Sequence, residues 1–241
     1  MVKKPPLIYF LTELVRGLWD RMRSMRYRWA LPAAESTDPH PVLIIPGLLS
    51  DDASTKPLRQ VLQRRGFQVY GWGLGRNMAK LTDLEALEAR LVQLYDQHQA
   101  KINIIGWSLG GIYARKIAAD HPELTKQIIT LGSPYQDINA PSWATYTVKF
   151  LWGTREIIIP REHQGWISDL GIARPLPTTS IYSRQDGIVP WDCCTEDVQD
   201  EWHQNIEVSS SHTSMIANVD VLKICLDRVS TAIEDWAPYE K

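Results

Sequence analysis

A serine lies between two glycines in the segment Ile104-Ile105-Gly106-Trp107-Ser108-Leu109-Gly110-Gly111. The apolar residues before Gly106 predict a buried strand, and the residues after Ser108 predict a helix. Where a strand turns at once into a helix, the backbone packs so closely beside the serine that glycine is needed on both sides. Such a turn lifts the serine hydroxyl to a helix N-terminus, where backbone N–H groups favour a developing oxyanion. The pattern therefore predicts a nucleophile rather than an inert serine in a glycine-rich junction.

A serine hydroxyl is a poor nucleophile unless a base lies beside it. The candidates are the six histidines His40, His98, His121, His163, His203 and His212. His212 alone follows the last predicted strand, so its loop would return to the carboxyl end of the sheet, where open α/β folds build their sites. A loop histidine is more often simply solvated, but this placement predicts that His212 is the base.

Asp186 follows another predicted strand, in the segment Ser183-Arg-Gln-Asp-Gly-Ile-Val-Pro190. A carboxylate there could accept the imidazole N–H of His212, fix its tautomer and stabilise the imidazolium. The rival acid, Asp192, follows Pro190-Trp191 and is expected to cap a helix. Asp186 is therefore the predicted partner of the histidine.

Around these residues, apolar runs alternate with helical patterns. We expect strands at 42–45, 67–70, 102–105, 127–131, 180–182 and 206–208, and helices at 57–65, from 82, at 109–120 and from 221. Parallel strands need long crossovers, so strands separated by helices predict a mostly parallel sheet with helices on both faces. The alternation stops at about 134–177, an aromatic-rich stretch whose length is typical of a small cap.

The G-x-S-x-G turn and the S-x-x-D-G-x-V-P segment resemble those of the α/β-hydrolase superfamily, in particular its small bacterial esterases and lipases, over about residues 40–236. The resemblance implies the α/β-hydrolase fold and hydrolysis of a small-molecule or lipid ester through a Ser108-His212-Asp186 triad and an acyl-enzyme. It requires no metal or organic cofactor. A thioesterase, amidase or acyltransferase with the same triad is an alternative, and a non-catalytic binding protein on this fold is a less favoured one.

The resemblance also implies an oxyanion hole made of two backbone N–H groups. One belongs to Leu109, directly after the nucleophile. The other belongs to Leu48, in a loop where many relatives have His-Gly and this chain has Pro46-Gly47. Three further side chains are expected to contact the substrate, namely Leu49, Trp107 and Trp72. The glycine-rich loop that holds Trp72 lacks the third glycine of a nucleotide-binding G-x-G-x-x-G, so it predicts no nucleotide.

We expect residues 1–38 to form a basic arm, made of an amphipathic helix and a linker, ahead of an α/β-hydrolase domain at 39–241. Residues 1–30 hold seven basic and two acidic residues, a net charge of +5, against −2 for the whole chain. An apolar stripe predicts an amphipathic helix and consists of Leu7, Leu11, Leu14, Leu18, Met22 and Met25. Two interpretations stay open, of which the first is slightly favoured: the stripe packs on the body, or it contacts an anionic membrane surface.

Composition narrows the setting of the protein. A chain of 241 residues suits one α/β domain, and its net charge of −2 gives no overall basic field for nucleic acid. Its three cysteines, Cys193, Cys194 and Cys225, are too few for a disulfide framework or a zinc site. These features indicate the cytoplasm, with peripheral membrane association under the second interpretation of the arm.

Overall fold

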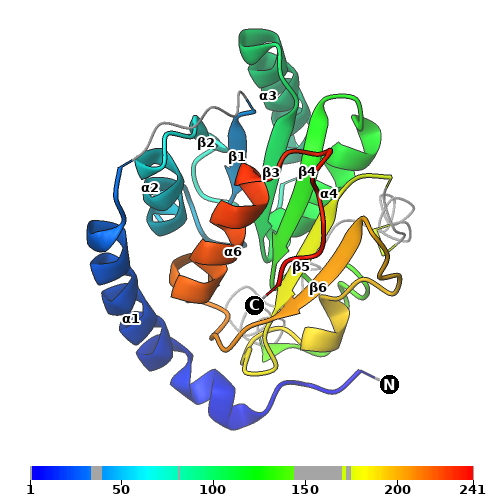
Figure 1. Cartoon of the computed structure of the whole chain (residues 1–241). Coiled ribbons are helices and arrows are strands. Elements are labelled where there is room, and N and C mark those ends of the chain that lie inside the picture. The colour runs from blue at the N-terminus through cyan, green and yellow to red at the C-terminus, as the bar shows by residue number, and fades with distance from the viewer. Residues whose placement is uncertain (1, 34–39, 81, 144–169, 172–174, 241) are drawn as a thin grey trace.

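The computed structural model describes residues 2–33, 40–80, 82–143, 170–171 and 175–240. Within these residues, six parallel strands form one sheet in the order β2-β1-β3-β4-β5-β6 (Figure 1). Their bounds are β1 Val42–Ile45, β2 Val69–Gly71, β3 Ile102–Trp107, β4 Thr125–Leu131, β5 Thr178–Tyr182 and β6 His203–Glu207. All six lie at or within three residues of the predicted strands, and the predicted parallel sheet is confirmed.

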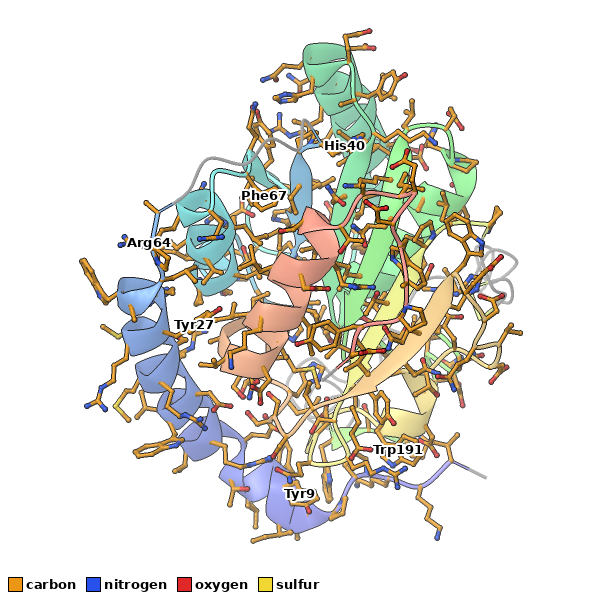
Figure 2. All side chains as sticks on the ribbon, viewed as in Figure 1. Tyr9, Tyr27, His40, Arg64, Phe67 and Trp191 are labelled. Carbon is orange, nitrogen blue, oxygen red and sulfur yellow. The ribbon has the colours of Figure 1, made fainter. Side chains whose placement is uncertain are left out.

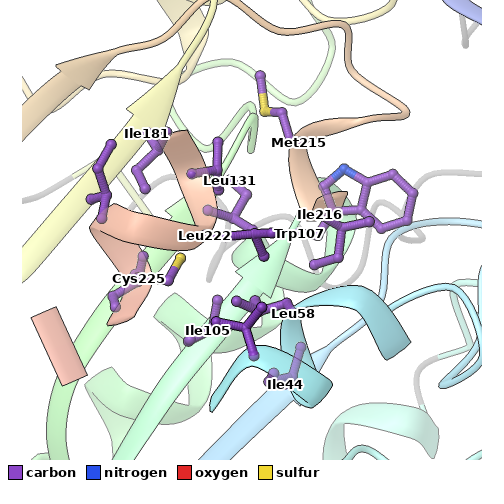
Figure 3. Close-up of a cluster of buried hydrophobic side chains, with 14 of the residues drawn as sticks. Ile44, Leu58, Ile105, Trp107, Leu131, Ile181, Met215, Ile216, Leu222 and Cys225 are labelled. Atoms are coloured by element: carbon purple, nitrogen blue, oxygen red, sulfur yellow. The ribbon is translucent and has the colours of Figure 1, made fainter. Parts of the chain in front are cut away.

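Helices cover both faces of this sheet. The described helices are α1 Leu7–Ala30, α2 Lys56–Arg64, α3 Thr82–His98, α4 Leu109–Asp120 and α6 Val219–Ser230, with short 3-10 turns η2 Trp191–Cys193 and η3 Met215–Ala217; α2 and α6 cover one face of the sheet, and α3 and α4 cover the other. Strand residues alternate between the faces. Ile44 and Ile105 pack with α2 and α6 (Figure 3), whereas Leu43 and Ile104 pack with α3 and α4. These two apolar layers hold the strand ends, and therefore the loops that follow them, in fixed positions.

The predicted cap falls mostly on residues that the structure does not describe. Its residues 144–169 and 172–174 lie outside the described part of the chain. At its start, Tyr135 is buried with Ile112 and Leu170, and its hydroxyl lies 2.6 Å from Ser180 Oγ. The chain therefore enters this stretch from a point fixed against β5.

Helix α1 lies along the outside of the body, in contact with α2, η3 and α6 (Figure 1). Its buried residues Glu13, Gly17, Asp20 and Ser24 are spaced four, three and four apart, so they form one face of the helix. The apolar stripe points the other way, with Leu14 80% exposed. The favoured interpretation, that the stripe packs on the body, was therefore wrong. The polar face packs on the body because its carboxylates accept hydrogen bonds from donors on the body.

None of the described helices is both long enough and apolar enough to cross a membrane.

Candidate active site

Ser108 occupies the junction between β3 and α4 with φ 54° and ψ −121°. A positive φ is strained for a residue with a Cβ and is typical of functional positions. A Cβ on Gly106 would lie 2.4 Å from the carbonyl oxygen of Gly110, and a Cβ on Gly110 would lie 2.3 Å from that of Ile45. Both flanking glycines are therefore required, for the steric reason that the sequence pattern predicts. The Ser108 N–H donates to the carbonyl of Leu131 on β4 at 2.8 Å, which anchors the turn.

Asp186 and His212 form a buried pair after β5 and β6. Asp186 is 3% exposed and His212 is 5% exposed, and 2.6 Å separates Asp186 Oδ2 from His212 Nδ1. A carboxylate only accepts hydrogen bonds, so Nδ1 carries the proton and Nε2 keeps a free lone pair. The other oxygen, Asp186 Oδ1, accepts the N–H groups of Ile188 and Val189 at 2.8 and 2.7 Å. The carboxylate is therefore held by its own turn and oriented toward the imidazole.

The electrostatic surroundings of His212 favour its protonated form. Burial lowers the pKa of His212, but the charge and hydrogen bond of Asp186, together with the charge of Glu13, outweigh it. The pKa of His212 therefore lies above its ordinary value. A base with a raised pKa takes a proton more readily once it is deprotonated.

The His212 loop crosses the ends of β3 and β4, where Ser108 lies. Trp107 Nε1 donates to the His212 carbonyl at 3.1 Å. A Cβ on Gly132, directly after β4, would lie 3.2 Å from His212 Nδ1. The structure thus gathers the predicted serine, histidine and aspartate at the carboxyl end of the sheet. Within the described residues, Ser108 Oγ has no hydrogen-bond partner, so it makes no hydrogen bond to His212 in this structure.

The loop after β1 lies against Ser108. A Cβ on Gly47 would lie 3.0 Å from Ser108 Cβ, so Gly47, the neighbour of Leu48 in the chain, lies against Ser108. The buried Asn77 braces this loop: its side-chain amide donates to the Pro46 carbonyl at 2.8 Å. No described residue accepts a hydrogen bond from the Leu48 N–H. Leu109 begins α4, and the first N–H groups of a helix have no intrahelical acceptor.

The three predicted substrate contacts have different environments. Leu49 is 38% exposed beside the Leu48 loop. Trp107 is only 6% exposed; its ring packs in the core, and its indole N–H holds the His212 loop. The structure corrects the prediction for Trp72, which is 1% exposed and packs among core residues of α3, while its Nε1 donates to the Gly75 carbonyl at 2.9 Å. The ring completes the apolar layer on that face of the sheet.

A buried carboxylate from α1 reaches the same loops and was missed in the sequence. Glu13 Oε1 accepts the N–H of Gly187 at 2.8 Å and the N–H of His212 at 3.0 Å. Its Oε2 accepts both the N–H and the hydroxyl of Thr213 at 3.1 Å. Arg16 pairs with Glu13 at 3.3 Å. One carboxylate thus ties the turn after Asp186 to the loop of His212.

The sequence did contain a weak signal for this contact. The two acids of the arm, Glu13 and Asp20, are seven residues apart and so share a helix face with Gly17 between them. A Cβ on Gly17 would lie 2.8 Å from Thr213 Oγ1, so the small residue permits close docking. Asp20 Oδ2 accepts the Ser214 hydroxyl at 2.7 Å. Two acids and a glycine on one face of a basic helix therefore marked its docking side.

No protein-family model and no curated protein matches the sequence. Solved structures do resemble it. The mature lipase BlEst2 of Bacillus licheniformis superposes with a TM-score of 0.63 at 13% identity, covering 83% of this chain and 96% of that chain. A 2-hydroxy-6-oxo-6-phenylhexa-2,4-dienoate hydrolase from Rhodococcus sp. strain RHA1 gives 0.59 at 16%, covering 82% and 92%. A thioesterase domain from the curacin biosynthetic pathway gives 0.55 at 15%, covering 81% and 93%. Together with the strand order, these likenesses show that the chain has the α/β-hydrolase fold.

Proposed function

We propose that this protein is a serine hydrolase that cleaves carboxylic esters through an acyl-enzyme. The observation that carries the proposal is the buried Asp186–His212 pair, at the same end of the sheet as a serine held at positive φ. A structural turn needs neither feature, because strain and a buried charge both cost stability. The solved hydrolases with this fold support the same class of chemistry.

The acylation step uses the groups in the arrangement described above. Nε2 of His212 accepts the proton of the Ser108 hydroxyl as Oγ bonds to the ester carbonyl carbon. The carbonyl π electrons move to oxygen, and the N–H groups of Leu48 and Leu109 stabilise this oxyanion. Asp186 stabilises the imidazolium. As the oxyanion collapses, the bond to the leaving alcohol breaks and His212 donates its proton to that alcohol.

Deacylation repeats the sequence with water as the nucleophile. His212 accepts a proton from water as its oxygen bonds to the acyl carbon. The second tetrahedral intermediate collapses, the bond to Ser108 Oγ breaks, and the serine regains its proton. The carboxylic acid leaves, and no further reactant is consumed.

Covalent labelling tests the nucleophile directly. A fluorophosphonate probe should modify wild-type protein once, on the peptide that contains Ser108, as read by mass spectrometry. Ser108→Ala should abolish the label. The matched control Ser209→Ala, which changes an exposed serine of the His212 loop, should keep it. Failure of the wild type to react would favour a non-catalytic binding protein.

A substrate panel then separates ester hydrolysis from its alternatives. The panel contains p-nitrophenyl esters from acetyl to palmitoyl, an acyl thioester, an anilide, and an ester with added alcohol. Hydrolysis of the oxygen esters as the fastest reaction supports the proposal. Faster cleavage of the thioester or the anilide, or transfer of the acyl group to the alcohol, would instead indicate a thioesterase, an amidase or an acyltransferase that uses the same triad.

A further inference from the structure

The outward face of α1 is an apolar surface that no described residue covers. Its exposed residues are Leu7, Ile8, Leu11, Leu14, Val15, Leu18, Trp19, Met22, Met25 and Trp29, and their exposed fractions run from 47% to 80%. Because α1 has 24 residues, this stripe is roughly 36 Å long. Figure 2 shows side chains projecting from the outer side of this helix into solvent. A continuous apolar surface of this kind marks an interaction site.

The acidic and basic residues of α1 lie on different faces of the helix. Its two acids, Glu13 and Asp20, are both buried against the body. Arg21, Arg23 and Arg26 are exposed. At 100° per residue, Arg21 lies on one side of the stripe and Arg23 on the other, so positive charge borders the apolar surface along both edges. Within the described residues of α1, every charge that reaches solvent is therefore positive.

A cationic groove continues this surface between α1 and α2. It has a volume of about 640 Å³, and its lining includes Arg21, Arg28 and Trp29 from α1 and Lys56 and Arg64 from α2. Figure 2 shows Arg64 between the two helices. None of the described residues that line the groove is acidic. Burial and the nearby charge of Arg21 both lower the pKa of Arg28, as expected where cations crowd without an anion.

We propose that α1 seats this protein on an anionic phospholipid surface, with its apolar stripe among the acyl chains and the groove cations against headgroup phosphates. An amphipathic helix with tryptophan on its apolar face and basic residues along its edges suits that interface. The rest of the chain, residues 31–241, carries a net charge of −7. The same anionic surface repels it, which orients α1 toward the lipid.

A second copy of the chain fits this face less well. Two α1 helices packed stripe against stripe would bring their arginine borders together. The exposed face of α1 has no acid to pair with them, since Glu13 and Asp20 point into the body. Like charges in contact oppose such a dimer, whereas a phosphate surface neutralises them.

Vesicle co-sedimentation of the full chain tests the proposal. Wild-type protein should sediment with vesicles of phosphatidylcholine mixed with phosphatidylglycerol, and only weakly with phosphatidylcholine alone. Leu14→Ser with Leu18→Ser removes apolar surface from residues that are 80% and 61% exposed, so folding should be unaffected while binding is lost. Arg21→Gln with Arg28→Gln should weaken binding to anionic vesicles roughly thirtyfold, at about 1 kcal/mol per cation.

Control variants make the same kinds of change elsewhere on the surface, with apolar residues replaced by serine and basic residues by glutamine. Val92→Ser with Val198→Ser also removes exposed apolar side chains, and Arg90→Gln with Lys116→Gln removes two charges from α3 and α4. Both controls should bind vesicles as the wild type does. Equal losses in test and control variants would overturn the proposal. The proposal would also be overturned if the wild type did not bind vesicles. If light scattering then showed a dimer, and Leu14→Ser with Leu18→Ser dissociated it, the face would be assigned to a second copy of the chain.

Discussion

The carboxylate of Glu13 accepts the backbone N–H of His212 at 3.0 Å, across 199 positions of the chain. The same oxygen accepts the N–H of Gly187, directly after Asp186. The N-terminal helix is therefore part of the scaffold that holds the proposed base and its acid in place. Its outer face is left free for another surface.

Glu13→Gln should lower kcat/KM by about tenfold or more, because the charge-assisted hydrogen bonds to two site loops weaken. It should also move the acid limb of the kcat/KM profile to lower pH. The sign follows from the charge of Glu13, which raises the pKa of His212; removing that charge lowers it, so His212 becomes neutral at a lower pH. Glu201→Gln, at an exposed position, is the control for charge loss. A lower rate with an unmoved limb would reduce Glu13 to a purely structural role.

The wild-type pH profile should show the raised pKa of His212. An imidazole accepts a proton only when it is neutral, so if His212 is the base, kcat/KM should rise with pH through a limb above the pKa of an ordinary imidazole. Asp186→Asn should remove most of the activity, roughly 10⁴-fold, because it loses the charge that stabilises the imidazolium and the acceptor that fixes the tautomer. Initial rates across pH for both proteins check this. An acid limb below the ordinary imidazole range would contradict it.

Gly110→Ala should destabilise the fold strongly. Its Cβ would meet the backbone of Ile45 and Pro46 at 2.3 to 2.8 Å, and backbone cannot rotate away. We expect a loss of about 3 kcal/mol in the free energy of unfolding, at the upper end for overpacking. Gly75→Ala is the matched control: nothing lies within 4 Å, so only the strain of its φ of +76° remains, about 1 kcal/mol. Urea unfolding compares the two, and equal losses would show that the junction is not tightly packed.

Gly187→Ala should release the N-terminal half of α1. A Cβ there would lie 2.3 to 2.5 Å from the backbone of Tyr9 and Phe10. Limited proteolysis should then cut within α1 faster, and activity should fall with it. The only close contact of a Cβ on Gly17 is the Thr213 hydroxyl at 2.8 Å, a side-chain group that can rotate at the cost of its hydrogen bond to Glu13, so the effect of Gly17→Ala should be smaller. The reverse order of sensitivity would contradict the packing described for α1.

The sequence was most informative where chemistry and structure are local. The turn at Ser108, the strands around it and the position of Asp186 follow from short patterns whose steric demands lie within a few residues of each other, whereas His212 was chosen because it follows the last predicted strand. The docking of α1 did not follow, because an amphipathic pattern shows which face is apolar and not which face packs on the body. The N–H donors to Glu13 belong to the backbone of Gly187, His212 and Thr213. Almost every residue has a backbone N–H, so the residue types in a sequence do not reveal such donors. The expectation that Trp72 contacts the substrate failed for a similar reason, because its position in a loop does not show whether its side chain is buried.

Ester hydrolysis by Ser108→Ala and His212→Ala beside the wild type is the most direct test of the central claim. The account predicts that kcat falls by roughly 10⁴- to 10⁶-fold in each variant, and that the double variant falls no further, because the two residues act as one unit. Circular dichroism should confirm that both variants stay folded. Near-normal hydrolysis by either folded variant would contradict the assignment of this site.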